Sequence, residues 1–437
     1  MNESVKAAST GITACSQANF DIEFPAAHVK MLTVSLLLVF SAVSGLAMPI
    51  AQPSYDGVIR PTGDGREIAY MIPPFASSHA SHVQPIVAGE GLAMVWFSGT
   101  KEGADNVSIV IAHLTTANSS AWSTAFVISR RPGYSNQNPV LHTSQDGSLH
   151  LFHSSQPASQ GEDHASVWTA IAPDGTGAAP GMWSQPEEIF SKAGSFTKNR
   201  VLFAVDNSTW LLPMYYATGP NDDQYSHIKT SNTLGHGPWG NLDFKDTSHL
   251  VQPTVIRPRS GHPGLTAFFR DRDAAHIYRA TSGDDGKSWT SPAATPLPNN
   301  NAGIQACQLQ DGRVAIVFNP TTKSRSLLAI ALSEDGGLTW PHQRLLENET
   351  SGEFSYPTLF QDAVTRQLHV SYTYLRETIK CADGVSTDLR SPYLPRARHR
   401  PHCHRAFSLY RLRKTSQLAL DDRRYTRLEV DWIARLR

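Results

Sequence analysis

The chain has 437 residues, and its 38 lysines and arginines balance 38 aspartates and glutamates, so the formal net charge at pH 7 is +0. This balance argues against a strongly basic surface, and nothing global indicates nucleic acid as a partner. Charged residues make up only 17% of the chain, while 30 glycines and 28 prolines provide for many turns. The composition suits one large globular domain.

An apolar run begins at Met31, directly after Lys30, and ends at the small residues before Ala47. It is shorter than the ~20 residues that span a bilayer. A basic residue before such a run and small residues after it are typical of a secretory signal peptide. We predict that residues 1–47 are an N-terminal extension plus a signal peptide that starts at Met31, and that the protein is secreted. A signal anchor and a buried strand are the alternatives, and we expect no stable membrane span.

Two further features bear on export. Asn-x-Ser/Thr triplets agree with it but are common by chance; they lie at Asn106, Asn118, Asn207 and Asn348. Of the four cysteines, Cys15 precedes the expected mature start, and the odd number that remains predicts no disulfide framework.

Short apolar and β-branched runs, separated by Asp-Gly turns, follow through most of the chain. The first clear run is Gly91–Phe97, and typical turns are Asp146-Gly147 and Asp311-Gly312. No apolar pattern keeps a helical period, so we expect no long helix. Residues 52–75 are expected to supply a strand that closes the fold.

Two turn motifs repeat with the form S-x-D-x-G-x-[ST]-W, at Ser282–Trp289 and Ser333–Trp340. Aspartate and glycine suit the tip of a hairpin, because Asp bonds its own backbone and Gly tolerates positive φ. A repeat about every 50 residues is typical of a β-propeller; it is marked by Trp122, Trp183, Trp239, Trp289 and Trp340. Chance spacing is the alternative, but the two complete motifs favour a true repeat.

The C-terminal part breaks this pattern. Residues 381–424 are basic and have little strand pattern, whereas residues 425–433, with Trp432, again alternate like a strand. Removing the basic block restores the period and adds a sixth blade. We therefore predict a propeller over residues 52–437 that is interrupted by an insertion at about 381–424.

The basic block has several possible origins and roles. It could be translated intron or a lineage-specific loop, and its charge could anchor an acidic polymer. A zinc site is a less favoured alternative, because the spacing matches no standard zinc finger; its ligands would be Cys381, His402, Cys403 and His404.

The two turn motifs resemble the Asp-box repeats of the sialidase superfamily. The resemblance is strongest to bacterial-type sialidase-like BNR proteins, which share runs similar to Gly352–Pro357 and Tyr372–Lys380. It implies an all-β fold, a six-bladed β-propeller, and a carbohydrate as the partner. The Asp box alone says little about activity, because it also occurs in propellers that are not sialidases.

The resemblance also implies a set of site residues. Sialidases hold a sugar carboxylate with three arginines, because the guanidinium fork matches a carboxylate. Arg270 and Arg325 match the second and third arginine, and Tyr356 matches the tyrosine nucleophile. Taken singly, each arginine could equally form a surface salt bridge and Tyr356 could be a core aromatic. We expect the two arginines to approach each other across a central pocket.

Three positions depart from the sialidase pattern. His79 stands where the first arginine is expected, and Gln252 stands at the position of the glutamate that activates the tyrosine. Asp105 is the available acid/base residue, one position away from Asn106, which is in register with the family's aspartate. A glutamine cannot accept the tyrosine proton. If His79 joins the clamp, affinity for an acidic sugar should rise as pH falls through the imidazole range. Glu102 and Glu353 are spare carboxylates, and Glu353 with either Glu102 or Asp105 would make a conventional acid/base pair if they face each other across the pocket.

Three hypotheses remain open. The first is a secreted glycoside hydrolase of the sialidase superfamily that releases a terminal, acidic sugar. The second is a carbohydrate-binding propeller without catalysis, and the third is a structural or interaction propeller without a sugar site. None of them requires a metal or a cofactor.

Overall fold

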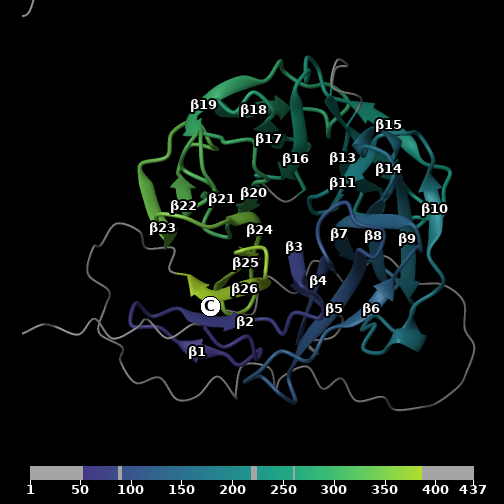
Figure 1. The fold of residues 1–437 in the computed structure, drawn as a ribbon. Helices are drawn as coiled ribbons and strands as arrows, with labels where there is room; N and C mark the ends of the chain where they lie inside the picture. Colours follow the sequence, from purple (N-terminus) through teal and green to yellow (C-terminus); the bar gives the residue numbers. More distant parts are fainter. Residues whose placement is uncertain (1–52, 87–90, 218–223, 259–260, 386–437) are drawn as a thin grey trace, which may run out of the picture. The chain divides into compact units, whose positions relative to one another are not determined.

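The computed structural model describes residues 53–86, 91–217, 224–258 and 261–385. These residues form six antiparallel sheets arranged as the blades of a ring (Figure 1). Two short 3-10 helices, η2 (Glu162–His164) and η3 (Pro180–Met182), are the helices of the described residues. In this part of the chain, no helix has the length and apolarity needed to cross a membrane. The expected all-β, six-bladed propeller is confirmed.

Each blade begins at the centre of the ring and runs outward. The innermost strands are β3 (Ser77–Pro85), β7 (Tyr134–Thr143), β11 (Ser195–Thr197), β16 (Leu250–Ile256), β20 (Gln305–Gln308) and β24 (Phe354–Gln361). The second strands are β4 (Gly91–Gly99), β8 (Leu149–Pro157), β13 (Trp210–Tyr216), β17 (Leu265–Asp271), β21 (Val314–Phe318) and β25 (Leu368–Tyr374). A short strand β12 (Leu202–Phe203) also pairs with β13.

The outer half of each blade is less buried. The third strands are β5 (Ser108–Thr115), β9 (Ser166–Ala172), β14 (Tyr225–Ser231), β18 (His276–Ser282), β22 (Leu327–Ser333) and β26 (Thr378–Val385). The fourth strands are β6 (Phe126–Ser129), β10 (Glu187–Phe190), β15 (Gly240–Asp243), β19 (Ala293–Pro298) and β23 (His342–Asn348). The sixth blade differs, since its outer strands are β2 (Glu67–Tyr70) and β1 (Arg60–Pro61).

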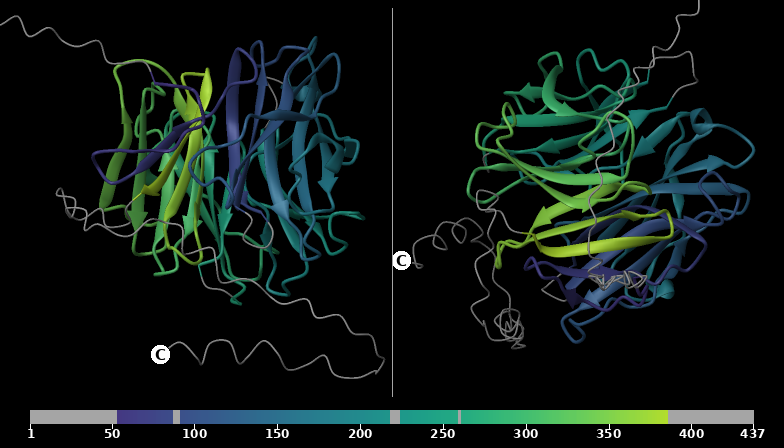
Figure 2. Two further views of the ribbon diagram at one scale, coloured as in Figure 1. Left: turned by 90° about the horizontal axis from the view of Figure 1, so that it is seen from below. Right: turned by 60° about the vertical axis from the view of Figure 1, so that its left-hand side comes forward.

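The ring is therefore closed by a strand from the N-terminal side of the propeller, as expected for residues 52–75. Strand β2 pairs with β26 from Glu67 opposite Asp383 to Tyr70 opposite Lys380 (Figure 2). This arrangement joins the two ends of the propeller in one sheet. The strand expected at residues 425–433 lies outside the described residues.

The insertion was predicted to begin at about residue 381, and the structure places that residue inside a strand. Strand β26 continues to Val385, and Cys381 is buried within it, so any insertion begins later. Strand β26 contains a β-bulge near its end. Its register with β25 shifts between Asp383 and Val385, and Gly384 between them has φ +67°. Gly384 is thus the extra residue of a bulge inside a strand. Residues 386–424, with three of the four residues considered as zinc ligands, lie outside the described residues.

The two Asp boxes have matching hydrogen bonds. In the first, Ser282 Oγ donates to Asp284 Oδ1 (2.8 Å), and Ser288 N donates to the same oxygen (2.9 Å). In the second, Ser333 and Thr339 make the same two bonds to Asp335 Oδ1 at 2.7 and 2.9 Å. The repeat extends to the tryptophans, which all lie between the third and fourth strand of successive blades: Trp122, Trp183, Trp239, Trp289 and Trp340.

The apolar cores lie between neighbouring blades. One buried cluster joins the first and second blades, another joins the fourth and fifth, and a third joins the fifth and sixth. A strand in the middle of a blade is covered on both faces by neighbouring blades. Its sequence is therefore a nearly continuous apolar run, as in Trp210–Tyr216 of β13. Packing of this kind leaves the inner strands to present polar side chains to the axis.

Four of the inner strands carry a β-bulge close to their first residues. At each bulge a residue other than glycine has φ between +50° and +54°: Ala80, Asn138, Gln252 and Tyr356. This backbone conformation is strained for such residues and costs about 1–3 kcal/mol at each position. Bulges re-aim side chains, and two of the four belong to the site predicted from the sequence.

Candidate functional site

The candidate site lies at the end of the ring where the inner strands begin. Strands alternate in direction, so this end also holds the loops between second and third strands, whereas the Asp boxes lie at the opposite end. Tyr356 is 7% exposed here. Arg270, from the end of β17, donates from Nη1 to Tyr356 Oη at 2.6 Å and from Nε to Asn301 Oδ1 at 2.8 Å. The structure thus brings together the predicted middle arginine and the predicted nucleophile.

Arg325 reaches the same tyrosine from the fifth blade. Its guanidinium carbon lies 5.4 Å from the Tyr356 ring centre, and that of Arg270 lies 5.6 Å from it. Arg325 Nη1 forms an ion pair with Glu353 at 2.8 Å, and Nη2 donates to the backbone oxygen of Asn301 at 3.0 Å. The two arginines therefore converge on one aromatic ring, and Asn301 contacts both.

A third guanidinium comes from Arg376, in the turn between β25 and β26. Its Nε contacts Glu353 Oε2 at 2.9 Å, and its Nη1 contacts Glu102 Oε2 at 2.6 Å. Leu375 and Arg376 have φ of +55° and +63°, and the Arg376 backbone oxygen accepts the N–H of Ser78. This turn therefore covers the start of β3, beside the position where sialidases carry their first arginine. Sequence reasoning missed Arg376, although it lies within the family-like run Tyr372–Lys380.

Glu353 and Glu102 serve as partners of these arginines. Burial alone raises the pKa of Glu353, but the hydrogen bond and charge of Arg376, with the charge of Arg325, bring it below the usual value. Glu353 is therefore ionised at neutral pH and cannot donate a proton as a general acid. Its pairing with two arginines argues against Glu353 as half of a conventional carboxylate pair.

His79 does not supply the missing positive charge. It is fully buried, its Nδ1 lies 2.8 Å from Thr373 Oγ1, and its ring centre lies 4.2 Å from that of Tyr356. Burial lowers the pKa of His79 well below 6.5, and the charges of Arg376, Arg325, Lys198 and Arg270 lower it further. The imidazole therefore stays neutral at neutral pH, and the pH dependence expected from His79 is corrected. Arg376, whose backbone oxygen accepts the Ser78 N–H, supplies a guanidinium beside the start of β3 instead.

Lys198 is a second residue that the sequence did not reveal. It follows β11, its side chain is only 2% exposed, and its Nζ lies 5.6 Å from the Tyr356 ring centre. Burial, and then the charge of Arg270, lower the pKa of Lys198 to about 7. A signal that could have identified it is the polar run Thr197–Arg200, which begins at the last residue of an inner strand. Among the described residues, neither Lys198 nor Arg270 forms an ion pair with a carboxylate.

Gln252 lies beside the tyrosine without bonding to it. Its Nε2 donates to Tyr215 Oη at 3.2 Å, and its backbone oxygen accepts Asn199 Nδ2 at 2.9 Å. A Cβ at Gly303 would lie 3.1 Å from Gln252 Oε1 and 3.3 Å from Tyr356 Cγ. The absence of a side chain at Gly303 therefore lets the amide and the ring approach from two sides. Within the described chain, no carboxylate hydrogen-bonds the Tyr356 hydroxyl group.

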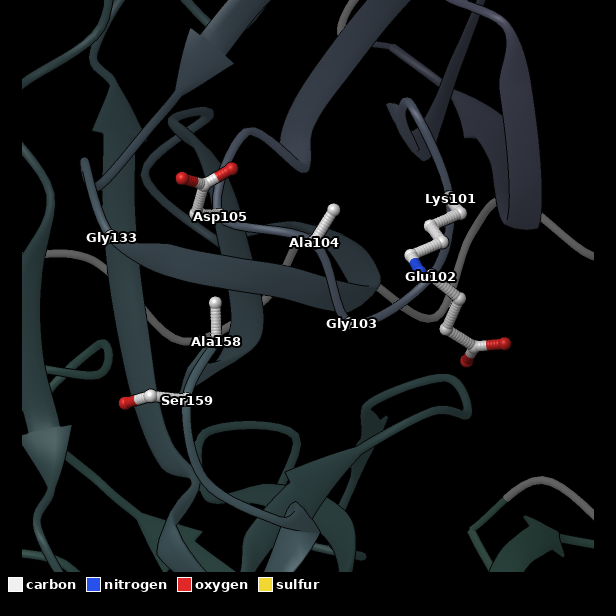
Figure 3. Close-up of a pocket in the computed structure, with 8 residues that line it drawn as sticks. All are labelled: Lys101, Glu102, Gly103, Ala104, Asp105, Gly133, Ala158 and Ser159. Atoms are coloured by element: carbon white, nitrogen blue, oxygen red, sulfur yellow. The ribbon is translucent and has the colours of Figure 1, made fainter.

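Asp105 lies on the loop between β4 and β5, at the rim of the site. It lines a cavity of ≈ 690 Å³ between this loop and a second wall made by Gly133, Ala158 and Ser159 (Figure 3). Asp105 and Glu102 lie at opposite ends of the loop, and their carboxylates point in different directions. Ala104, between them, packs against the buried cluster that contains Tyr356. Because Glu102 lines the cavity and also pairs with Arg376, the cavity adjoins that arginine.

A nearby group of three residues, His249, Asp271 and Asp273, has the types that ligate metals. The Asp271 carboxylate already accepts backbone N–H groups from Asp273, Ala275 and His276, as well as His249 Nδ1. These bonds explain the group as a structural tie for the loop after β17. We assign no metal to it.

Comparison with known structures places this architecture among sialidases. The chain aligns with the Hadza microbial sialidase Hz136 at 16% identity and a TM-score of 0.59, over 71% of this chain and 66%, just under two thirds, of the other. It aligns with the intramolecular trans-sialidase from Ruminococcus gnavus at 11% identity and a TM-score of 0.61, over 78% and 100% of the two chains. A protein of unknown function from Dyadobacter fermentans aligns at 15% identity and a TM-score of 0.57, over 77% of this chain and 99% of the other.

At these identities the structural likeness establishes the fold alone. None of the curated proteins compared with the chain gives a significant match. The family model described as a BNR repeat-like domain matches residues 90–370, which is more than half of the chain. The protein therefore belongs to the BNR repeat-like domain family and has a sialidase-like propeller.

Proposed function

We propose that this protein is a glycoside hydrolase of the sialidase superfamily that removes a terminal acidic sugar. The observation that carries the proposal is the 2.6 Å contact from Arg270 Nη1 to Tyr356 Oη inside a group of four cations. The other three are Lys198, Arg325 and Arg376. Glu353 and Glu102 pair with Arg325 and Arg376, whereas Arg270 and Lys198 have no carboxylate partner among the described residues. A carboxylate on the sugar is the partner that would neutralise these two charges.

In this reaction the sugar carboxylate binds to the cations and places the anomeric carbon next to Tyr356. The Tyr356 oxygen attacks that carbon as its phenol proton passes to water, and the bond from the carbon to the departing group breaks. The oxygen of the departing group takes a proton, for which Asp105 is the candidate donor. A water molecule then adds its hydroxyl group to the sugar carbon and returns a proton to the Tyr356 oxygen, which frees the sugar. Arg270 donates to the phenol oxygen and so stabilises the negative charge that develops there. A neutral tyrosine avoids the repulsion that a carboxylate nucleophile would have with an acidic sugar.

A direct test uses chromogenic glycosides of N-acetylneuraminic, glucuronic and galacturonic acid, with neutral glycosides as controls. We expect turnover of an acidic substrate and loss of turnover in Tyr356→Phe, which removes only the hydroxyl group. Turnover of neutral substrates alone, or full activity of Tyr356→Phe, would refute the proposal.

A non-catalytic sugar-binding propeller is the second candidate, and Gln252 favours it. An amide cannot accept the phenol proton, and the Gln252 side chain bonds to Tyr215 rather than to Tyr356. Binding of an acidic sugar without turnover by the wild-type protein, together with turnover in Gln252→Glu, would support this candidate.

We also propose that the protein is secreted after cleavage behind Ala47. The apolar run from Met31 supports this proposal, and the assay is N-terminal sequencing of the protein from culture medium. A chain that begins near Met48 is expected, and a chain that stays in the cell with Met31 intact would refute it.

A further inference from the structure

Lys198 has an environment that differs from those of the other buried cations in this fold. Its side chain is 98% shielded from solvent, and its Nζ has no hydrogen-bond partner among the described residues. By contrast, Lys380 is also buried, but its Nζ contacts the Glu347 carboxylate and lies near the rings of Tyr70 and Tyr374. Arg200, two residues after Lys198, donates to the Val83 backbone oxygen at 2.6 Å. A structural role accounts for both of these cations but not for Lys198.

The groups that face Lys198 come from three inner elements. Tyr356 of β24 presents its ring, Arg270 of β17 is the charged neighbour, and His79 and His82 of β3 lie within range of the Lys198 charge. Burial lowers the pKa of both histidines well below 6.5, and nearby positive charges, including that of Lys198, lower it further. Neither histidine is therefore protonated near neutral pH. Unlike these two histidines, Lys198 can change its charge near neutral pH.

A buried ammonium group without a partner is unfavourable, because it has lost its hydration and gained no compensating bond. Burial, followed by the charge of Arg270, accordingly lowers the pKa of Lys198 to about 7. An anion placed among Arg270, Arg325 and Lys198 would reverse this effect, because an opposite charge favours the protonated form. The site is therefore arranged to respond to an anion at this position.

We propose that Lys198 is a substrate-binding residue that takes up one proton when an anionic sugar enters the pocket. This inference rests on the proposed function, which supplies the acidic sugar as the ligand. It adds Lys198 to the sugar-binding residues, and with it a pH dependence of affinity that the three arginines cannot provide. Arginine stays charged throughout the physiological range. The protonated lysine then donates to the sugar carboxylate as a fourth cation.

The sign of the pH dependence follows from this coupling. Below about pH 7 Lys198 is already protonated, so affinity is high and independent of pH. Above that value binding must also draw a proton from solvent, so affinity falls by about tenfold per pH unit until the pKa of the bound complex is reached. His79 makes no contribution in this range.

Isothermal titration calorimetry in two buffers with different ionisation enthalpies measures this proton directly. The ligand is N-acetylneuraminic, glucuronic or galacturonic acid, at pH 6 and pH 8.5. We expect close to one proton taken up at pH 8.5 and little at pH 6. Lys198→Arg should bind without proton uptake, Lys198→Met should bind roughly ten- to a hundredfold more weakly and without uptake, and His79→Gln should keep the uptake. An acidic sugar that binds wild-type protein without proton uptake would overturn the inference and leave the proposed function standing.

A second measurement separates the two proposals without a sugar. The Lys198 Cε resonance, assigned with Lys198→Arg, is titrated by NMR in the free protein and with acetate as a simple carboxylate. A free pKa near 7 that rises by a unit or more in acetate supports a carboxylate site at Lys198, even if none of the three sugars binds. A free pKa near 10, or one that acetate leaves unchanged, would overturn the inference.

Discussion

Arg270→Met tests whether the cationic centre serves binding or folding. The arginine is 4% exposed and donates two hydrogen bonds, to Asn301 and to Tyr356. Losing two bonds to a charged donor costs about 1.5–3 kcal/mol each. The substitution also removes a buried guanidinium that has no carboxylate partner in the described chain, and burying such an ion costs several kcal/mol. These effects oppose each other, so we expect the free energy of unfolding to change by at most about 2 kcal/mol.

Binding should respond much more strongly. One charge-assisted hydrogen bond to a sugar carboxylate contributes about 1.5–3 kcal/mol, so its loss should weaken binding of an acidic sugar roughly ten- to a hundredfold. Because the Arg270 charge helps to lower the pKa of Lys198, that pKa should also rise in the variant. Calorimetric titration, chemical denaturation and NMR measure the three quantities.

The matched control for this experiment is Arg279→Met. Arg279 donates from Nε to the Gly336 backbone oxygen at 2.9 Å, in an Asp box at the opposite end of the ring. This control should leave binding unchanged. If Arg270→Met unfolds the protein, or lowers its stability by well over 3 kcal/mol while the affinity persists, Arg270 is a structural residue and the clamp reasoning is wrong.

Four other predictions concern different parts of the chain. Glu347→Gln should lower the free energy of unfolding by about 3–5 kcal/mol, because it leaves Lys380 buried and unpaired. Adding Lys380→Met should restore much of this loss in denaturant titrations. Equal stability of the single and the double variant would argue against the ion pair. Asp335→Ala should cost about 1–3 kcal/mol in the same assay, since its carboxylate accepts hydrogen bonds from Ser333, Leu338 and Thr339, and an unchanged midpoint would show that the turn forms without it. His79→Gln should not alter the pH dependence of sugar affinity between about pH 5.5 and 7.5, because burial and nearby cations hold the pKa of His79 well below 6.5; a profile that flattens in this variant would place His79 in the titration. Truncation after Val385 should keep one cooperative unfolding transition, because all six described sheets lie within residues 60–385, and loss of folded protein would show that residues 386–437 contribute to the core.

Much of the fold was predictable from the sequence because it depends on local chemistry. Asp284 and Asp335 bond to the backbone within their own turns, so each Asp box is specified by a few consecutive residues. The tryptophans share one place, between the third and fourth strand of five successive blades, so their spacing follows the repeat. The resemblance to sialidases, and not the repeat, pointed to Arg270, Arg325 and Tyr356, and a shared axis brings their blades together.

The tertiary structure decided what depends on burial and on contacts between distant residues. Closure by β2, the bulge at Gly384 and the approach of Arg376 to the start of β3 all join segments far apart in the chain. The charge states of His79 and Lys198 depend on desolvation and on neighbouring cations, so neither could be predicted from residue type. The sequence by itself determined a propeller, because turns and strand periods are local, whereas the arginines were expected from the resemblance to sialidases. The fold decided which cations surround Tyr356 and which of them can lose a proton, because electrostatics in a pocket acts between side chains from separate blades.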